Sequence, residues 1–184
     1  MGAIHRPQPV KLFIGVLSSV AGILPEVECR LTAFLGHVDL RSEAFPFEST
    51  HYYDNEVGSP IRRNFLGFSD LIGPDQVAAI KVKTNELEAQ LAEEFSQVQR
   101  PANLDPGYLE QSKIVLASTK NFYHRLYLSE GIYAEVTLHF EGGDWKALPW
   151  TFPDFRSGLY NVFFTELRNI YRDQLKSEAK TLKH

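Results

Sequence analysis

Apolar side chains occupy nearly every position between Val10 and Leu17. A strand with one solvated face would alternate apolar and polar residues, so this run indicates a central strand with both pleat faces covered. A secretory signal is the alternative, because basic residues surround the start of the run and small residues follow it at 19–21. Ser18-Ser19 breaks the stretch, and Pro7 and Pro9 precede it, which favours the strand. We therefore expect a buried strand in a cytoplasmic protein.

The composition predicts one folded domain covering residues 1–184. The chain is 43% hydrophobic and 23% charged, and its 19 basic and 23 acidic side chains give a formal net charge of −4. A chain of this length buries more than half of its unfolded surface, and its normal apolar content excludes a disordered chain. The single cysteine, Cys29, excludes a disulfide-stapled fold, and the mild acidity disfavours a dedicated nucleic-acid binder. No apolar run reaches the ~18 residues of a membrane span.

Periodicity in the first half predicts a ferredoxin-like βαββα opening of an α+β fold. After the first strand we expect a helix, an extended segment, a turn-rich loop, a strand and a second helix, at residues 25–35, 37–47, 50–60, 62–71 and 77–95. The second helix follows Gly73-Pro74-Asp75 and repeats apolar residues at spacings of three and four. Its outer face, which we expect to be solvated, carries Lys81, Lys83, Glu86, Glu88, Glu93 and Glu94.

The second half is expected to add a β-hairpin and a C-terminal helix. Two prolines mark residues 100–107 as a connection. Residues 108–118 suit either a helix, which Asp105-Pro106 would cap, or a short strand, and we favour the helix. The remaining elements are a hairpin, a further strand and a helix that starts near Phe155 or Leu159, at residues 122–140, 145–148 and 155–175. The ends, 1–9 and 177–184, are expected to fray.

The register of the hairpin follows from the parity of its strands. A three-residue loop at 129–131 keeps one face apolar and places Gly131 where the loop needs a left-handed residue. Tyr127 then pairs with Tyr133, and Arg125 lies opposite Glu135. Tyrosines for stacking around an arginine suggest a binding surface for an anionic group. A solvated sheet face with an ordinary charge pair is the alternative.

Common catalytic and nucleotide-binding signatures are missing from the sequence. It contains no phosphate loop, no dinucleotide-binding glycine motif and no nucleophile elbow. The six histidines are scattered, and His124 falls on the apolar face of the hairpin, where we expect a core histidine. Acid–base groups can still assemble from distant residues, and the catalytic candidates are Asp105, Glu135 and His139. A metal site would combine these with His51, Asp54 and Glu56, but we assign no metal and no cofactor.

Several runs resemble a prokaryotic family of uncharacterised proteins, the domain of unknown function DUF4416. The most specific are Val115-Leu-Ala-Ser-Thr-Lys120, Gly131-Ile-Tyr-Ala-Glu-Val-Thr-Leu138 and Leu148-Pro-Trp-Thr-Phe-Pro-Asp-Phe155, and the resemblance covers roughly residues 10–175. Some members are labelled GTP-binding, so the resemblance implies nucleotide binding, and residues 117–120 are similar to a guanine-contacting loop. These runs contain Lys120, Glu135, Trp150 and Asp154, a further similar run at 103–109 contains Asp105, and Arg125 lies within the span of the resemblance. Asp105 and Asp154 have helix capping as an alternative role.

Three functions follow from these observations. The first is a module for a nucleotide-like or other anionic ligand, with RNA as a less favoured variant; its residues are Lys120, Tyr123, Arg125, Tyr127, Tyr133, Glu135 and Asp154. The second is an enzyme of hydrolase type, metal-dependent or not, that uses the three catalytic candidates. The third is a protein-interaction module whose tyrosines contact a partner chain. The sequence specifies no oligomeric state, and we expect no membrane partner.

Overall fold

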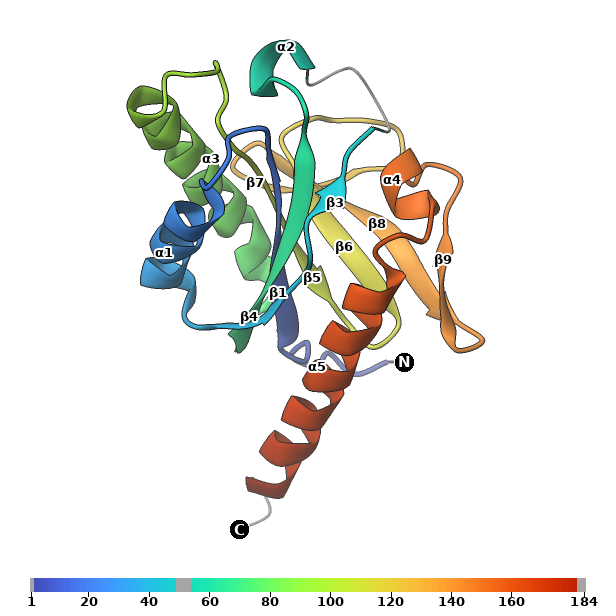
Figure 1. Ribbon diagram of the computed structural model, residues 1–184. Helices are drawn as coiled ribbons and strands as arrows, with labels where there is room; N and C mark the ends of the chain where they lie inside the picture. Colours follow the sequence, from blue (N-terminus) through green and yellow to red (C-terminus); the bar gives the residue numbers. More distant parts are fainter. Residues whose placement is uncertain (1, 49–53, 182–184) are drawn as a thin grey trace.

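A nine-stranded antiparallel sheet organises the chain in the computed structural model, which describes residues 2–48 and 54–181 (Figure 1). The strand order is β2-β4-β1-β5-β6-β8-β7, with β3 pairing with β4 and β9 pairing with β8. The strands are β1 (Val10–Ser18), β2 (Val38–Arg41), β3 (Phe45–Pro46), β4 (Arg62–Ile72), β5 (Asn103–Leu109), β6 (Lys113–Ser118), β7 (Leu126–Ser129), β8 (Ile132–Glu141) and β9 (Asp144–Ala147). The chain is a single α+β domain, and the periodicity of the sequence predicted this fold class.

The first strand has the central position that its apolar run predicts. β1 lies between β4 and β5, and its residues are buried from Val10 to Leu17. Its alternate side chains enter two different cores, with Leu12, Ile14 and Val16 on one face of the sheet and Phe13 on the other. The sheet therefore needs a covering layer on each side.

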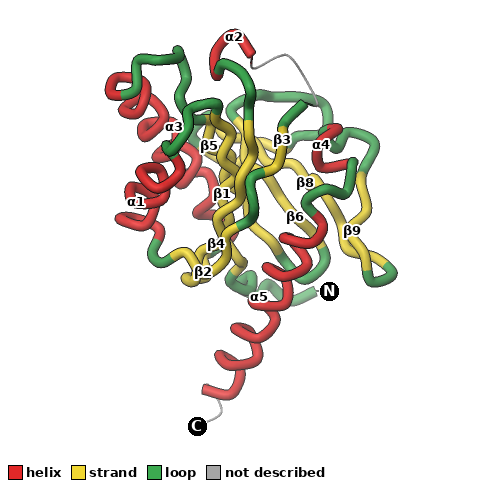
Figure 2. The backbone as a smooth tube through the Cα atoms, in the orientation of Figure 1, coloured by secondary structure: helices red, strands yellow, loops and turns green. Residues whose placement is uncertain are grey.

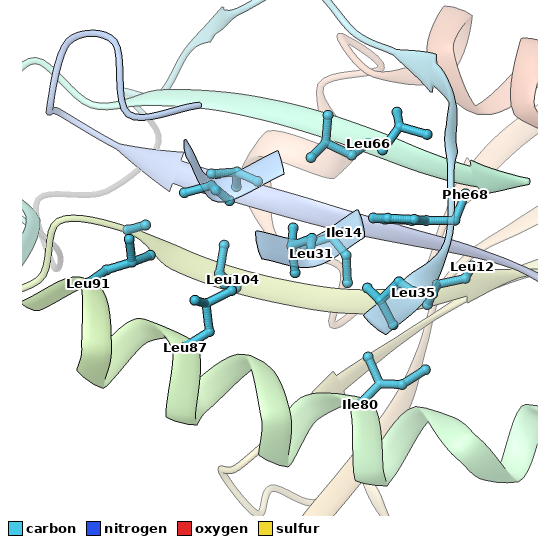
Figure 3. Packing of buried hydrophobic residues seen from close by; sticks show 14 of the residues in the cluster. Leu12, Ile14, Leu31, Leu35, Leu66, Phe68, Ile80, Leu87, Leu91 and Leu104 are labelled. Carbon is cyan, nitrogen blue, oxygen red and sulfur yellow. The ribbon is translucent and has the colours of Figure 1, made fainter. Parts of the chain in front are cut away.

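Helices supply both layers (Figure 2). One face is covered by α1 (Leu24–Leu35) and α3 (Val77–Glu94), and the other by α4 (Pro153–Arg156) and α5 (Asn161–Thr181). The chain also contains the short helix α2 (Asp54–Val57) and the 3-10 turn η1 (Pro74–Gln76). Figure 3 shows the core beneath the first pair, where Ile80, Leu87 and Leu91 of α3 point toward strand residues such as Leu104. No helix in the described part of the chain is both long and apolar enough to cross a membrane.

Aromatic rings fill the second core, between the sheet and α5. Phe65 of β4 is at its centre, with ring centroids 4.8 Å from Tyr160, 5.1 Å from Phe164 and 5.3 Å from Phe163. Phe13 of β1 contacts Phe164 edge to face at 5.1 Å. Pairs in these geometries stabilise a core beyond the area that they bury, so most of the rings of the C-terminal third have a packing role.

Two predictions for the middle of the chain are wrong. Residues 103–109 form β5 rather than a connection, and 113–118 form β6 rather than the favoured helix, so the strand alternative holds there. Pro106 is compatible with β5 because β6 pairs with β5 only from Gly107 to Leu109. The missing N–H of Pro106 therefore breaks no contact with β6.

The hairpin is present with a different turn. Tyr127 pairs with Tyr133 as predicted, but Ser129 pairs with Ile132, so the loop has two residues rather than three. Glu130 and Gly131 both have positive φ, 53° and 77°, as a type I′ turn requires. An irregularity between Tyr127 and Ser129 absorbs the extra residue.

Three further differences concern helix ends and loops. The segment expected as a loop at 50–60 contains α2, and its residues 50–53 lie outside the described part. The C-terminal helix is divided into α4 and α5 by residues 157–160. Residues 177–181, part of the end that we expected to fray, belong to α5 in the described part of the chain, and residues 182–184 lie outside it.

Candidate functional site

A cavity of about 570 Å³ opens at the end of the sheet where β5 and β6 stop pairing. The last paired residues are Gly107 and Leu116. Beyond that point, Asn103 and Asp105 of β5 line one side of the cavity, and the segment from Leu116 to Lys120 lines another. The remaining wall comes from β4, α3, β8 and the start of α4, so six elements of the sheet and its helices meet there.

A buried arginine lies at the bottom of the site. Arg63 of β4 has Nη1 3.2 Å from Asp105 Oδ2 and Nε 3.4 Å from Asp154 Oδ2, and all three side chains line the cavity. Its guanidinium carbon also lies 5.3 Å from the ring centre of Phe47 and 5.7 Å from that of Phe155. Two carboxylates and two aromatic rings thus replace the water that the guanidinium loses on burial.

The ion pair of Arg63 and Asp105 keeps both groups charged. Burial alone would raise the pKa of Asp105, but the positive charges of Arg63 and Lys81 and a hydrogen bond from Asn103 outweigh it and lower that pKa. Burial alone would likewise lower the pKa of Arg63, whereas the carboxylates of Asp105 and Asp154 raise it. Asp105 is therefore an ionised acceptor at neutral pH.

The face of α3 that we expected to be solvated contributes the second charged wall of the cavity. Lys81 and Glu88 are buried, which corrects the expectation for two of its six residues. Lys81 Nζ donates to Leu104 O at 2.7 Å and lies 3.7 Å from Glu88 Oε1. The same Glu88 oxygen accepts the Leu104 N–H at 2.7 Å, and Glu88 Oε2 accepts from Arg100 Nη2 at 2.5 Å. These bonds attach α3 to β5, and Lys81 and Arg100 both line the cavity.

The third wall contains the predicted pair of Arg125 and Glu135. Arg125 Nε donates to Glu135 Oε2 at 2.7 Å, but Arg125 precedes β7 and reaches Glu135 from a turn rather than across the hairpin ladder. Arg125 Nη1 donates to Ser118 Oγ at 3.0 Å and to Lys120 O at 2.9 Å. The arginine thus connects the loop after β6 to β8.

His124 occupies a polar environment rather than the apolar core that we expected. Its Nε2 lies 3.0 Å from Glu135 Oε2, and its ring stacks on Trp150 with centroids 5.5 Å apart and planes 8° from parallel. Trp150 Nε1 donates to Val136 O at 2.9 Å. The side chain of His124 is therefore buried behind Glu135 and supports it from outside the cavity lining.

The structure separates the predicted site residues into two groups. Those in the cavity lining are Asp105, Lys120, Arg125, Glu135 and Asp154. Tyr123, Tyr127, Tyr133 and His139 are not in the lining. The rings of Tyr127 and Tyr133 contact each other at 5.4 Å on the hairpin, and His139 lies toward the other end of β8, 3.4 Å from Glu141. The tyrosines therefore do not surround the charged residues.

Sequence reasoning missed the site residues Arg63, Lys81 and Arg100. A signal exists for Lys81, because it lies three residues before buried Thr84 and seven before Glu88, a spacing that keeps them on one stripe of the helix. Arg63 lies in a strand whose other positions are mostly apolar, and its two carboxylates are 42 and 91 residues away in the sequence. Local patterns cannot pair charges at such separations.

The chemistry of the cavity is that of a charged pocket with apolar walls. Its carboxylates face arginine or lysine groups, and among the described residues no cluster of three or more histidine, cysteine or carboxylate side chains suits a metal ion. His51, which belonged to the speculative metal grouping, lies outside the described residues. The lining thus carries groups that can form ion pairs and hydrogen bonds as well as apolar contacts.

Comparison with known proteins shows the family and leaves the activity open. No curated protein and no solved structure matches the chain. The family model described as a domain of unknown function, DUF4416, matches residues 8–171, which agrees with the span of the resemblance found in the sequence. The chain belongs to the DUF4416 family.

Proposed function

We propose that the cavity binds a small organic anion, a phosphorylated or carboxylated molecule of nucleotide-like size. The observation that carries this proposal is the convergence of five cationic side chains on one cavity, against three carboxylates; the cations are Arg63, Lys81, Arg100, Lys120 and Arg125, and the carboxylates are Asp105, Glu135 and Asp154. Glu88 and Glu56 offset part of this charge from outside the lining, so the excess is confined to the side chains that face the cavity, where five cations stand against three carboxylates. An anion is the complement of that excess.

The dimensions of the cavity support a small molecule. Ligand pockets commonly enclose about 300–1,000 Å³ with mainly apolar walls and a few convergent polar groups, and this cavity has about 570 Å³. Phe47, Phe152, Phe155 and Leu116 supply apolar surface. A ligand with a planar or aliphatic body and one acidic group would use both parts of the lining.

Arg125 and Lys120 are the groups that we expect to contact the acidic part. The Nε and Nη1 atoms of Arg125 have protein acceptors, whereas Nη2 has none among the described residues and retains its two N–H donors. Lys120 is exposed at the entrance, where a long charged side chain attracts an anion from solution. Asn85 of α3 adds an amide on the other side of the cavity.

Nucleotides are one class within this proposal. Because the sequence has no phosphate loop, a phosphate in this cavity would be held by side chains rather than by a cradle of backbone N–H groups. The enzymatic alternative would use Asp105 and Glu135, which share the cavity, but the lowered pKa of Asp105 disfavours it as a proton donor at neutral pH. Binding is therefore the function that the geometry supports best.

The test is a thermal-shift and calorimetry panel on the full chain. Its probes are GTP, GMP, ribose 5-phosphate, inorganic phosphate and citrate. We expect at least one to bind, and we expect Lys120→Ala to weaken that binding by about tenfold, because a charge-assisted contact contributes about 1.5 kcal/mol. Thr119→Trp, an exposed lining position, should block entry.

Lys146→Ala is the matched control, because Lys146 is an exposed lysine of β9 outside the cavity. It should bind the same probe as tightly as the wild type. Equal losses in Lys120→Ala and Lys146→Ala, or binding that Thr119→Trp leaves unchanged, would contradict the proposed location. A product formed from any probe would instead favour the enzymatic alternative.

We also propose that the first half of the chain is a ferredoxin-like unit. Support comes from the antiparallel order β2-β4-β1-β5 and from the position of α1 and α3 on one face, since a split βαβ unit interleaves its strands in this way. An experimental structure with α1 and α3 on opposite faces would contradict this classification.

A further inference from the structure

β7 is an edge strand, and no described strand pairs with its outer side. It is the last strand of the sheet, and in the described part of the chain it pairs only with β8. All four of its residues are exposed, including Leu126 at 76% and Tyr127 at 61%. An edge of this kind offers a row of backbone N–H and C=O groups to another strand.

The other edges of the sheet carry charges that oppose such pairing. β2 at the opposite edge contains Asp39 and Arg41, and β9 contains Asp144 and Lys146. Charged side chains are a common protection of edge strands. β7 has the sequence Leu-Tyr-Leu-Ser and contains no charge at all. It is therefore the edge that another strand can approach without burying an ion.

Exposed rings next to β7 enlarge this apolar surface. Phe122 is 57% exposed and Tyr123 is 77% exposed, and their rings contact each other at 5.0 Å. A buried aromatic side chain covers about 150–250 Å², so these rings with Tyr127 and the two leucines of β7 present on the order of 600 Å². Two such surfaces together reach the lower bound of a stable interface, about 1,200 Å².

We propose that β7 pairs antiparallel with β7 of a second copy of this chain, so that two sheets join across a two-fold axis. An isologous contact requires a surface that complements itself. β7 meets this requirement, because antiparallel pairing is the geometry of every pair in this sheet and because its side chains bring no like charges together.

The charge directly before β7, that of Arg125, does not oppose this contact between two copies of the strand. Arg125, directly before β7, is turned inward and neutralised by Glu135 at 2.7 Å. Antiparallel pairing centred on β7 would place Arg125 opposite Glu130 of the second copy, an opposite charge, rather than opposite a second Arg125. Because Arg125 also lines the cavity, the dimer contact and the cavity share one chain segment.

The experiment measures the mass of the full chain in solution by light scattering and sedimentation. We expect twice the monomer mass for the wild type at micromolar concentrations. Leu126→Lys should halve that mass, because it places a charge on each side of the two-fold axis. Val162→Lys is the matched control, since Val162 is 79% exposed on α5, away from β7, and this variant should remain a dimer.

Hydrogen exchange on the wild type shows which edge is used. The outward amides of β7 should be protected at high protein concentration and lose that protection on dilution. A wild type that is monomeric at every concentration overturns the proposal, and so does a dimer that Leu126→Lys leaves intact. A monomer that acquires β7 protection only with another protein would identify a foreign strand as the occupant and overturn self-pairing.

Discussion

Arg63 Nη1 lies 3.2 Å from Asp105 Oδ2, and this ion pair connects β4 and β5 on either side of the central strand. The two residues are not neighbours in any strand ladder, because β1 separates their strands. Their contact is therefore made by side chains that reach across β1 at the end of the sheet. Asp154 of α4 completes the group from the helical layer.

Replacing Arg63 should destabilise the fold strongly. Arg63→Met leaves two carboxylates without their cation in a buried site, and we expect a loss of about 3–5 kcal/mol in the free energy of unfolding. Arg41→Met is the control, because Arg41 pairs with Glu28 at the surface and should cost less than about 1 kcal/mol. Urea denaturation measures both values, and similar losses would contradict the role given to Arg63.

The lowered pKa of Asp105 predicts an acid-sensitive fold. A carboxyl group whose pKa is lower in the folded state than its unfolded value of about 3.9 stabilises the fold above that value. This contribution is lost as the pH falls from about 4 through the folded pKa. We expect the free energy of unfolding to decline with acidity in that window.

Asp105→Asn separates this effect from that of the other carboxylates. The variant should be less stable at neutral pH, and its stability should fall less steeply below about pH 4. Urea denaturation at a series of pH values gives both slopes. Parallel curves for wild type and variant would show that Asp105 does not titrate differently in the two states.

Glu88 should be the most sensitive carboxylate of α3. Glu88→Ala removes the acceptor of the Leu104 N–H and the partner of Arg100 and Lys81, so we expect a loss of about 3–5 kcal/mol. Glu86→Ala, on the exposed side of the same helix, should stay within about 0.5 kcal/mol of the wild type. Thermal or urea unfolding of the two variants distinguishes a tertiary role from a helix-propensity effect, which would move both alike.

Gly107 of β5 pairs with Leu116 of β6, the last pair of this ladder before the cavity. A Cβ atom at this position would lie 2.5 Å from the Val115 carbonyl oxygen and 2.6 Å from Phe13, so Gly107→Ala should destabilise the protein by about 3 kcal/mol. Gly2→Ala is the control, since its Cβ would meet nothing within 4 Å. Wild-type stability in Gly107→Ala would mean that the two strands separate easily at the cavity.

The sequence predicted those elements whose side chains follow a simple period. The apolar run of β1, the apolar stripe of α3 and the pairing of Tyr127 with Tyr133 are all found. In each case the residues that define the element are close together in the chain. Periodicity was sufficient there because the same face is buried along the whole element.

Prediction failed where distant contacts override the local pattern. Residues 103–109 contain a proline and a glycine and have little strand character, yet they form β5 because β1 provides a buried partner along their length. Lys81 and Glu88 have the composition of a solvated face, and they are buried because each satisfies the other and Leu104. Five of the candidate residues line one cavity, but the cations that complete it come from segments that no local pattern connects.

The stacking of His124 on Trp150 places an indole ring two contacts from the cavity. Of the two tryptophans, Trp145 is enclosed by the aromatic core, whereas Trp150 is half-buried against the imidazole that bonds Glu135. An occupant that contacts Arg125 would disturb the contacts that run from Arg125 through Glu135 to His124, on which the indole is stacked, and the emission of an indole responds to such a change in its surroundings. The protein thus has its own fluorophore behind the wall of the cavity, and its emission can follow occupancy in unlabelled wild-type material.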